Sequence, residues 1–467
     1  MWGIELNRQS ELSLRRQIYK AMTDRMLSGH VKAGEKLPST RELAHALSVS
    51  RNTVNEAYDL LIAEGFVISH QGAATRVADG LHIERDSQVK QPDQKTKPQS
   101  FIVNFQTGRP DLNAFPRYLW QRMAQKVFHE FKPEQLGYTG TQGLPELRSE
   151  IAAWLYRSKG LLVNTNDLFI TAGSTHALHI IADLVCQKGK QFLIEDPCHS
   201  GIYHILQNKG CPIAPVPVDA NGLQTDGLEG TNACAIYVTP SHQFPLGGIL
   251  PAGRRAELIR FAGKSGTYIV EDDYDSEFRY LGEPITPLYA MNPDRVIHVG
   301  TFSKSLFPAI RIGYAVLPPT LHQRWRDLRK YTDVQNSFFD QAVLAEFLHT
   351  RKFDRHLRQM RKRYDQRRQT LLASLTAFFG RQWRPWGDAS GLHLAAEFPG
   401  LRFDDSFINT CRQKGIYLTS VANHCIRDKK RHMNKLLLGY GHLEQDEIHR
   451  GISLLHDLVT KTIIRKG

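Results

Sequence analysis

A lysine at position 304 stands where a primary amine can do covalent chemistry. The segment GTFSKSLFPAIRIGY (300–314) places Lys304 just after a strand-like run, with Ser303 before it and Arg311 behind it. An ε-amino group can form a Schiff base with an aldehyde cofactor, and a serine with a forked arginine can hold a phosphate. A surface lysine at a turn is the alternative, and an isolated Ser-Lys pair would favour it.

A second run, YIVEDDYDSEF (268–278), places acidic and phenolic groups after another strand. The carboxylate of Asp272 can keep a pyridine nitrogen protonated, and the phenol of Tyr274 can hydrogen-bond a ring oxygen. The alternatives are an acidic loop or a divalent-metal site built from residues 271, 272, 273 and 275. Side chains alternate in an extended segment, so these carboxylates rarely converge on one ion. We therefore expect a cofactor site and no metal site.

A third run, TAGSTHALHIIADL (171–184), has the pattern of a turn from a strand into a helix. Ser174 and Thr175 follow Gly173, so free backbone N–H groups at the helix start can cradle a phosphate. An ordinary helix cap explains the same residues. Each run is a weak signal alone, and together they predict one pocket for an aldehyde cofactor that carries a phosphate.

Four short apolar runs are the strands expected to position these groups. They cover residues 192–195, 235–239, 268–271 and 295–299, and segments long enough for helices separate them. This alternation predicts an α/β fold with a mainly parallel sheet and helices on both faces. Ligands of such sheets bind at the carboxyl ends of the strands, where the runs around Asp272 and Lys304 begin.

A smaller module precedes this α/β segment and has the pattern of a helix-turn-helix. Periodic apolar residues and capping signals predict helices at 14–26, 39–47 and 50–64, and residues 66–68 and 75–77 predict a hairpin wing. The third helix would present polar groups to the DNA bases, and the second helix would present an arginine to a phosphate of the DNA backbone. A small helical domain with a polar face is the alternative. The DNA-binding candidates are Arg41, Arg51, Asn52, Thr53 and Asn55.

The polar run at 82–100 predicts a flexible linker. It divides the chain into a DNA-binding domain at 1–80, a linker at 81–100 and a body at 101–467. The formal net charge of +13, from 60 Lys and Arg against 47 Asp and Glu, favours polyanionic partners. No apolar stretch has the length of a membrane span, and charged residues interrupt the start of the chain where a signal peptide needs an apolar block. Six cysteines are too sparse for a disulfide framework, so we expect a cytoplasmic protein with reduced thiols.

Two known families resemble these segments. PSTRELAHALSVSRNTVNEAYDLLIAEGFV (38–67) is similar to the winged helix-turn-helix of GntR-type bacterial regulators, and the body resembles the fold-type I aminotransferases across most of residues 105–460. Their order, with a linker between them, resembles the MocR/GabR-type transcriptional regulators. That resemblance implies a homodimer that binds double-stranded operator DNA and senses a small effector: the cofactor itself, an amine or an amino acid.

The aminotransferase resemblance implies pyridoxal 5'-phosphate as the cofactor and assigns roles residue by residue. Lys304 matches the lysine that forms the Schiff base, Asp272 the partner of the pyridine nitrogen and Tyr274 the partner of the ring oxygen. The other matches are four phosphate ligands, a ring stacked on the cofactor and a tyrosine that reaches the partner subunit's phosphate: Ser174, Thr175, Ser303, Arg311, His199 and Tyr138.

Two segments depart from the aminotransferase pattern. TPSHQFPLGG (239–248) replaces the enzymes' usual N-P-x-G asparagine pattern, and its His242 and Gln243 either line the pocket rim or hold the loop. In LLLGYGHL (436–443), Leu437 stands where aminotransferases usually carry an arginine that clamps the substrate carboxylate, with Arg431 and Lys435 nearby. Loss of that clamp disfavours ordinary transamination. An active aminotransferase fused to a DNA-binding module remains the alternative to a regulator, and a scaffold that binds no cofactor is disfavoured because the cofactor residues are present.

Overall fold

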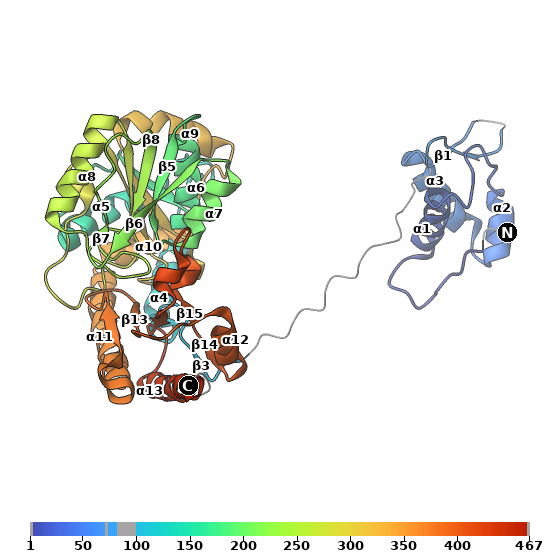
Figure 1. Cartoon of the computed structure of the whole chain (residues 1–467). Coiled ribbons are helices and arrows are strands. Elements are labelled where there is room, and N and C mark those ends of the chain that lie inside the picture. The colour runs from blue at the N-terminus through green and yellow to red at the C-terminus, as the bar shows by residue number, and fades with distance from the viewer. Residues whose placement is uncertain (1–2, 71–72, 82–99, 465–467) are drawn as a thin grey trace. The chain divides into compact units, whose positions relative to one another are not determined.

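The computed structural model describes residues 3–70, 73–81 and 100–464. The chain divides into two compact units, residues 1–98 and 99–467 (Figure 1), which are described separately. The predicted linker lies outside the described residues except at its two ends, so its boundaries stay a prediction. No helix in the described part of the chain is long and apolar enough to cross a membrane.

The small unit is a winged helix-turn-helix, as predicted. Its helices are α1 (Leu14–Leu27), α2 (Thr40–Leu47) and α3 (Arg51–Ala63), and its wing pairs β1 (Val67–Ile68) with β2 (Arg76–Val77) in antiparallel register. Ser39 and Glu42 form a capping box at the start of α2, and Ser50 caps α3 by accepting a hydrogen bond from the Thr53 N–H at 3.1 Å. The tip of the wing, residues 71–72, lies outside the described residues. These caps fix the turn that sets α3 against α2.

The large unit is built on an eight-stranded, mainly parallel sheet, which confirms the predicted fold. The four predicted strands are neighbours in the order β10-β9-β8-β5 and run parallel to one another. Within this sheet β7 and β11 run in the direction opposite to that of the other six strands. The strands in sheet order are β4 (Leu168–Thr171), β11 (Gly313–Val316), β10 (Val296–Thr301), β9 (Tyr268–Asp273), β8 (Ala233–Val238), β5 (Gln191–Asp196), β6 (Ile213–Asp219) and β7 (Gly222–Leu223).

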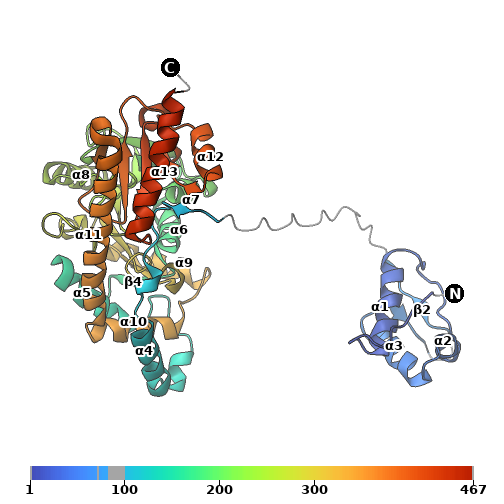
Figure 2. The same cartoon turned by 90° about the horizontal axis from the view of Figure 1, so that it is seen from below.

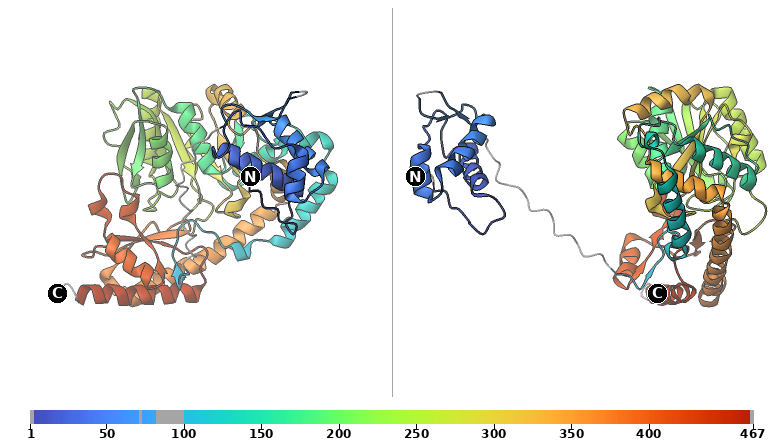
Figure 3. Two further views of the ribbon diagram at one scale, coloured as in Figure 1. Left: turned by 90° about the vertical axis from the view of Figure 1, so that its right-hand side faces the viewer. Right: turned by 180° about the vertical axis from the view of Figure 1, so that it is seen from behind.

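Side-chain alternation along the strands gives the sheet an apolar surface on each face. Val270 of β9 and Ile297 of β10 belong to the core shared with α6 (Ser174–Val185), α7 (Ser200–Asn208) and α9 (His322–Lys330). Ile269 and Val296, one residue earlier on each strand, belong to the core shared with α5 (Pro145–Lys159) and α8 (Ala252–Ser265). Helices therefore cover both faces, as Figures 1 and 3 show.

A second, smaller sheet lies beside the large one in the same unit. Its strand order is β12-β13-β16-β15, and a separate parallel pair joins β14 to β3. These strands are β12 (Arg384–Trp386), β13 (His393–Glu397), β16 (Lys435–Gly439), β15 (Thr419–Ser420), β14 (Ile416–Tyr417) and β3 (Val103–Asn104). The remaining helices are α4 (Arg117–Glu130), α10 (Phe338–His349), α11 (Lys352–Phe379), α12 (Asp405–Gln413) and α13 (Gln445–Ile464), of which α11 and α13 pack side by side (Figure 2).

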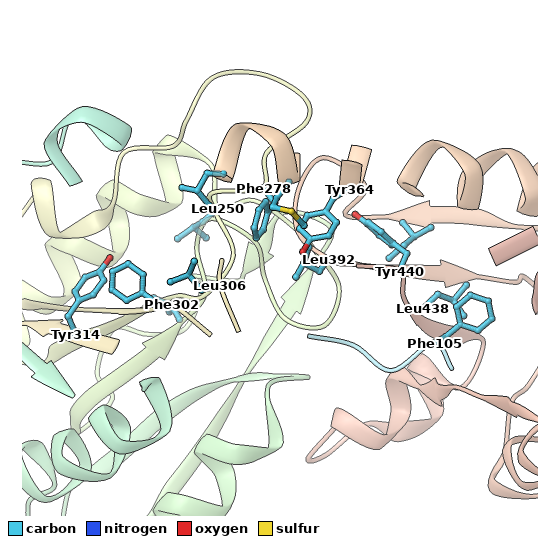
Figure 4. Close-up of a cluster of buried hydrophobic side chains, with 14 of the residues drawn as sticks. Phe105, Leu250, Phe278, Phe302, Leu306, Tyr314, Tyr364, Leu392, Leu438 and Tyr440 are labelled. Atoms are coloured by element: carbon cyan, nitrogen blue, oxygen red, sulfur yellow. The ribbon is translucent and has the colours of Figure 1, made fainter. Parts of the chain in front are cut away.

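One buried apolar cluster links the two sheets. Phe278 and Leu392 from opposite sides of the junction meet Tyr364 of α11, and the rings of Phe278 and Tyr364 pack edge to face with centroids 4.9 Å apart (Figure 4). The Tyr364 hydroxyl accepts a hydrogen bond from the Asp111 N–H at 2.9 Å. A close-packed junction of this kind resists relative movement of the two sheets and so fixes the walls of the space between them.

The sparse cysteines do not all stay free. Cys186 at the end of α6 and Cys211 just after α7 form a disulfide, with their Cα atoms 6.4 Å apart. The expectation of reduced thiols throughout the chain is therefore wrong. The pairing arises because α6 and α7 pack on the same face of the sheet, so residues 25 positions apart in sequence come together. The other four cysteines are free and buried.

Candidate cofactor site and DNA-binding surface

A cavity of about 290 Å³ opens at the carboxyl ends of β8, β9 and β10. It lies where the ligand of a doubly wound sheet is expected. The structure brings eight of the nine predicted cofactor residues to its wall and leaves out Tyr138. The eight are Ser174, Thr175, His199, Asp272, Tyr274, Ser303, Lys304 and Arg311.

Lys304 follows β10 and points its amine into this cavity. Its Nζ donates a hydrogen bond to the carbonyl oxygen of Gly108 at 2.7 Å. A Cβ on Gly108 would lie 2.6 Å from that nitrogen, so only glycine leaves room for the lysine. Burial lowers the pKa of Lys304, and the carboxylates of Asp275 and Asp272 oppose that shift. A lowered pKa favours the unprotonated amine, which is the form that attacks an aldehyde.

Asp272 presents one satisfied and one unsatisfied oxygen. The hydroxyl of Tyr237, a residue that the sequence did not reveal, donates to Oδ2 at 2.7 Å, whereas Oδ1 is buried without a hydrogen-bond partner. Burial raises the pKa of Asp272 to about 6. A buried unpaired carboxylate oxygen is costly, so Oδ1 suits a ligand N–H such as a protonated pyridine nitrogen.

The carboxylates next to Asp272 do not join it. Glu271 accepts a hydrogen bond from His298 at 3.0 Å, and Asp273 pairs with Lys159, both on the opposite face of the sheet. Alternation therefore separates Glu271 and Asp273 from Asp272, as expected, whereas Asp275 lines the same cavity as Asp272.

The phosphate-binding candidates surround the start of α6. Gly173, with φ of 88°, gives the helix no side-chain cap, and Ser174 and Thr175 of the first turn line the cavity. Arg311 adopts the left-handed conformation, with φ of 49°. Its guanidinium lies close to Gly173, because a Cβ built on that glycine would be 2.8 Å from the Arg311 Nη2 atom. The Ser303 hydroxyl accepts a hydrogen bond from Thr301 at 3.0 Å. A helix start, a guanidinium and a hydroxyl together make an anion site.

The ring that the resemblance placed on the cofactor is His199, the N-cap of α7. Its Nδ1 accepts a hydrogen bond from the Gly201 N–H at 3.1 Å. Burial, with the nearby Lys304, lowers the pKa of His199 and so keeps the ring neutral. A neutral imidazole can stack on an aromatic ring without bringing charge to it.

Phe244 is a cavity residue that sequence reasoning missed. Its ring packs against those of His199, Tyr274, His393 and His424, with centroids 5.0 to 6.2 Å apart. The departure from the N-P-x-G pattern was the signal that could have found it. The side chain of the adjacent Gln243 is fully buried and donates to the carbonyl oxygens of Pro197 at 2.9 Å and Phe244 at 2.6 Å. Gln243 was expected either to line the pocket rim or to hold the loop, and its hydrogen bonds show that it holds the loop.

The carboxylate clamp of the aminotransferases has no replacement in the described residues. Leu437 is fully buried in an apolar cluster with Phe244, behind the cavity wall. Lys435 is bound to Glu397 at 3.1 Å, and Arg431 lies exposed in the segment before β16. Among the described residues, the cations that line the cavity are Lys304 and Arg311.

Tyr138 lies on a loop away from the cavity of its own chain. Its side chain is 88% exposed. The backbone on both sides of it is held by Gln335, which accepts from the Thr139 N–H at 2.6 Å and donates to the Gly137 carbonyl oxygen at 3.2 Å. A large exposed phenol on a tethered loop is free to contact another molecule.

The predicted DNA-binding side chains of the helix-turn-helix differ in how far they are exposed to solvent. Arg41, Arg51 and Asn52 are exposed, and Arg51 Nε donates to the Thr40 hydroxyl at 3.3 Å, which is an exposed contact that DNA can displace. The Thr53 hydroxyl is instead 2.8 Å from that of Ser50 at the cap. Asn55 is half-buried on the same helix.

Comparison with known proteins identifies both units. Residues 14–77 match the family of bacterial regulatory proteins, gntR family, and residues 102–428 match aminotransferase class I and II. The chain therefore joins a GntR-type DNA-binding module to a class I and II aminotransferase domain. It is 30% identical to the probable rhizopine catabolism regulatory protein MocR of Rhizobium meliloti, over 96% of this chain and 94% of that protein. This chain belongs to the MocR-type family of transcriptional regulators.

Other relatives agree with this assignment. The pyridoxine biosynthesis transcriptional regulator PdxR of Corynebacterium glutamicum is 29% identical over 98% of each chain. Among solved structures, the Pyrococcus horikoshii kynurenine aminotransferase in complex with PMP superposes with a TM-score of 0.72 at 25% identity, over 78% of this chain and 92% of that one. An archaeal alanine:glyoxylate aminotransferase gives the same TM-score at 26% identity, over 77% and 91%. Proteins of this aminotransferase fold depend on pyridoxal 5'-phosphate.

Proposed function

We propose that this regulator holds pyridoxal 5'-phosphate on Lys304 and senses a small amine, amino acid or the cofactor itself in the cavity around it. The observation that carries the proposal is that one cavity is lined by a buried amine, by Asp272 with its orphaned Oδ1, and by the anion-binding groups Arg311 and the start of α6. When bound, the cofactor supplies an electrophilic carbon and an electron-withdrawing ring.

Each set of residues has one task in this proposal. Asp272 keeps the ring nitrogen protonated, Tyr274 donates to the ring oxygen, and His199 stacks on the ring. Ser174, Thr175, Ser303 and Arg311 hold the phosphate, and the missing carboxylate clamp leaves the cavity suited to binding rather than to turnover. An effector then alters DNA binding by favouring one arrangement of the two units over another. The deciding experiment is DNA-binding affinity with and without cofactor and effector.

The exposed arginine at the start of α3 should dominate base reading. We expect Arg51→Ala to weaken specific duplex binding by ~1–3 kcal/mol, roughly five- to 150-fold in Kd, if it contacts a base with both arms of its guanidinium. Lys20→Ala, which removes an exposed charge from α1 of the same unit, is the matched control. Titration of an operator duplex at two salt concentrations measures both variants. An unchanged footprint and affinity in Arg51→Ala would remove this residue from the base-reading set.

We also propose that the protein is a homodimer in which Tyr138 completes the partner's phosphate site. Tyr138→Phe should raise the Kd for the cofactor roughly 10- to 150-fold, which corresponds to the ~1.5–3 kcal/mol of one hydrogen bond to a charged group. Tyr331→Phe, which changes another highly exposed tyrosine, should leave it unchanged.

Mixed dimers give a sharper test of this sharing. A Lys304→Ala chain paired with a Tyr138→Ala chain should regain one site of full affinity per dimer, because that site takes its lysine from one chain and its tyrosine from the other. Sedimentation should show a dimer at micromolar concentration. A cofactor-bound monomer, or mixed dimers with no recovered site, would contradict the proposal.

A further inference from the structure

A buried histidine lies behind the cavity wall, between a tyrosine and a carboxylate that both line the cavity. His242 Nδ1 lies 3.0 and 3.1 Å from the two oxygens of Asp275, and both side chains are almost fully buried. The hydroxyl of Tyr274 is 3.1 Å from the same nitrogen and donates to the backbone oxygen of His242 at 3.0 Å. The three groups form a chain whose two ends, Tyr274 and Asp275, line the cavity.

The hydrogen positions in this chain follow from what each group can do. A carboxylate only accepts, so Asp275 fixes the hydrogen of His242 on Nδ1. That N–H also faces the Tyr274 oxygen, so the phenol keeps its own hydrogen to donate. In the described structure the phenol donates to a backbone carbonyl, and a ligand oxygen in the cavity can take that place.

The surroundings hold the imidazole in this orientation. A Cβ on Gly391 would lie 2.1 Å from His242 Cε1 and 2.5 Å from Asp275 Oδ2, so a glycine is needed to admit the pair. His393 packs over the imidazole with ring centroids 4.8 Å apart. The orientation of His242 is therefore set by packing and by Asp275 together.

We propose that His242 and Asp275 are positioning residues that keep the Tyr274 hydroxyl a hydrogen-bond donor to the ring oxygen of the cofactor held by Lys304. The inference rests on the proposed function and deepens it. Phe244 is the residue of the 239–248 loop that lines the cavity, where aminotransferases carry the asparagine of the N-P-x-G pattern. That loop therefore offers no side-chain amide to the ring oxygen, and Tyr274 lines the cavity with a hydroxyl that can donate to it.

This role predicts a pH effect with a definite sign. A hydrogen bond donated to the ring oxygen stabilises negative charge on that oxygen. This charge is greatest when the cofactor-bound Lys304 nitrogen has lost its proton, so the donor lowers the pKa of that nitrogen. Loss of the donor raises that pKa. The other titratable groups that act on Tyr274, His242 or their immediate neighbours are Asp272, Asp273, Asp275, Glu195, His393, His424 and Lys304.

The test is a pH titration of the visible absorbance of full-length, cofactor-loaded protein. Tyr274→Phe should raise the midpoint by about one unit, a tenfold change in proton affinity. His242→Phe should raise it by at least half as much, and the double variant by no more than Tyr274→Phe alone. His242→Asn, whose amide nitrogen can stand near the Nδ1 position, should stay close to the parent protein. His432→Phe, at a buried histidine outside the cavity lining, is the control.

Each other outcome overturns the inference. An unchanged midpoint in His242→Phe, or a shift that adds to that of Tyr274→Phe, would show that His242 does not act through the phenol. Loss of the cofactor from His242→Phe would make the imidazole a structural part of the pocket. His242, Asp275 and His393 also have ligand atoms within 4.8 Å of one another, so a midpoint that moves on dialysis against EDTA would assign a metal instead. Absence of a visible band in the parent protein would refute the proposed function itself.

Discussion

Replacement of Lys304 by alanine should abolish covalent attachment of pyridoxal 5'-phosphate. In the parent protein, borohydride reduction should leave close to one cofactor per chain fixed on Lys304, as measured by intact-protein and peptide mass spectrometry. The physical reason is that burial lowers the pKa of this amine inside the cavity, which favours the unprotonated form that attacks an aldehyde. Exposed lysines stay largely protonated at neutral pH and react far less.

Two further variants separate attachment from binding. Lys304→Arg keeps the positive charge but cannot form the linkage, so it should bind the cofactor only reversibly. Lys362→Ala, at an exposed lysine on α11, should retain full labelling. Stoichiometric reduction onto another lysine in Lys304→Ala would show that the assignment of Lys304 is wrong.

Transamination turnover by this protein should be negligible. Transfer of the Schiff base from Lys304 to an incoming amine needs only those two amines. Productive removal of the substrate's Cα proton also needs the Cα–H bond to be held perpendicular to the cofactor ring. A clamped carboxylate usually holds it there, and loss of such orientation can cost several orders of magnitude in rate. Leu437 is buried in an apolar cluster and Lys435 is already paired with Glu397, so neither can act as the clamp.

Single-turnover absorbance spectroscopy with a panel of amines and amino acids measures this directly. We expect spectral shifts without accumulation of the amine form of the cofactor, together with altered affinity for operator DNA. The related kynurenine aminotransferase of Pyrococcus horikoshii serves as the positive control. Rapid conversion to the amine form, reversed by a keto acid over repeated cycles, would refute the sensor role and support an enzyme.

Features that depend on a few consecutive residues could be predicted from the sequence. The capping signals of the small unit, which form the capping box of Ser39 and Glu42, and the apolar spacing of its three helices are visible in the sequence itself. The same holds for the four central strands and for Lys304 with Ser303 and Arg311, which lie in one short segment. Hydrogen bonds and side-chain alternation within such segments are local, so neighbouring residues determine them.

Features that join distant segments were decided only by the tertiary structure. Lys304 and Gly108 are 196 residues apart, and the Tyr237 hydroxyl reaches Asp272 from the next strand of the sheet. The disulfide of Cys186 depends in the same way on how α6 and α7 pack. No periodicity in the chain encodes these pairings, because they follow from strand register, from the face on which each helix packs and from the junction of the two sheets.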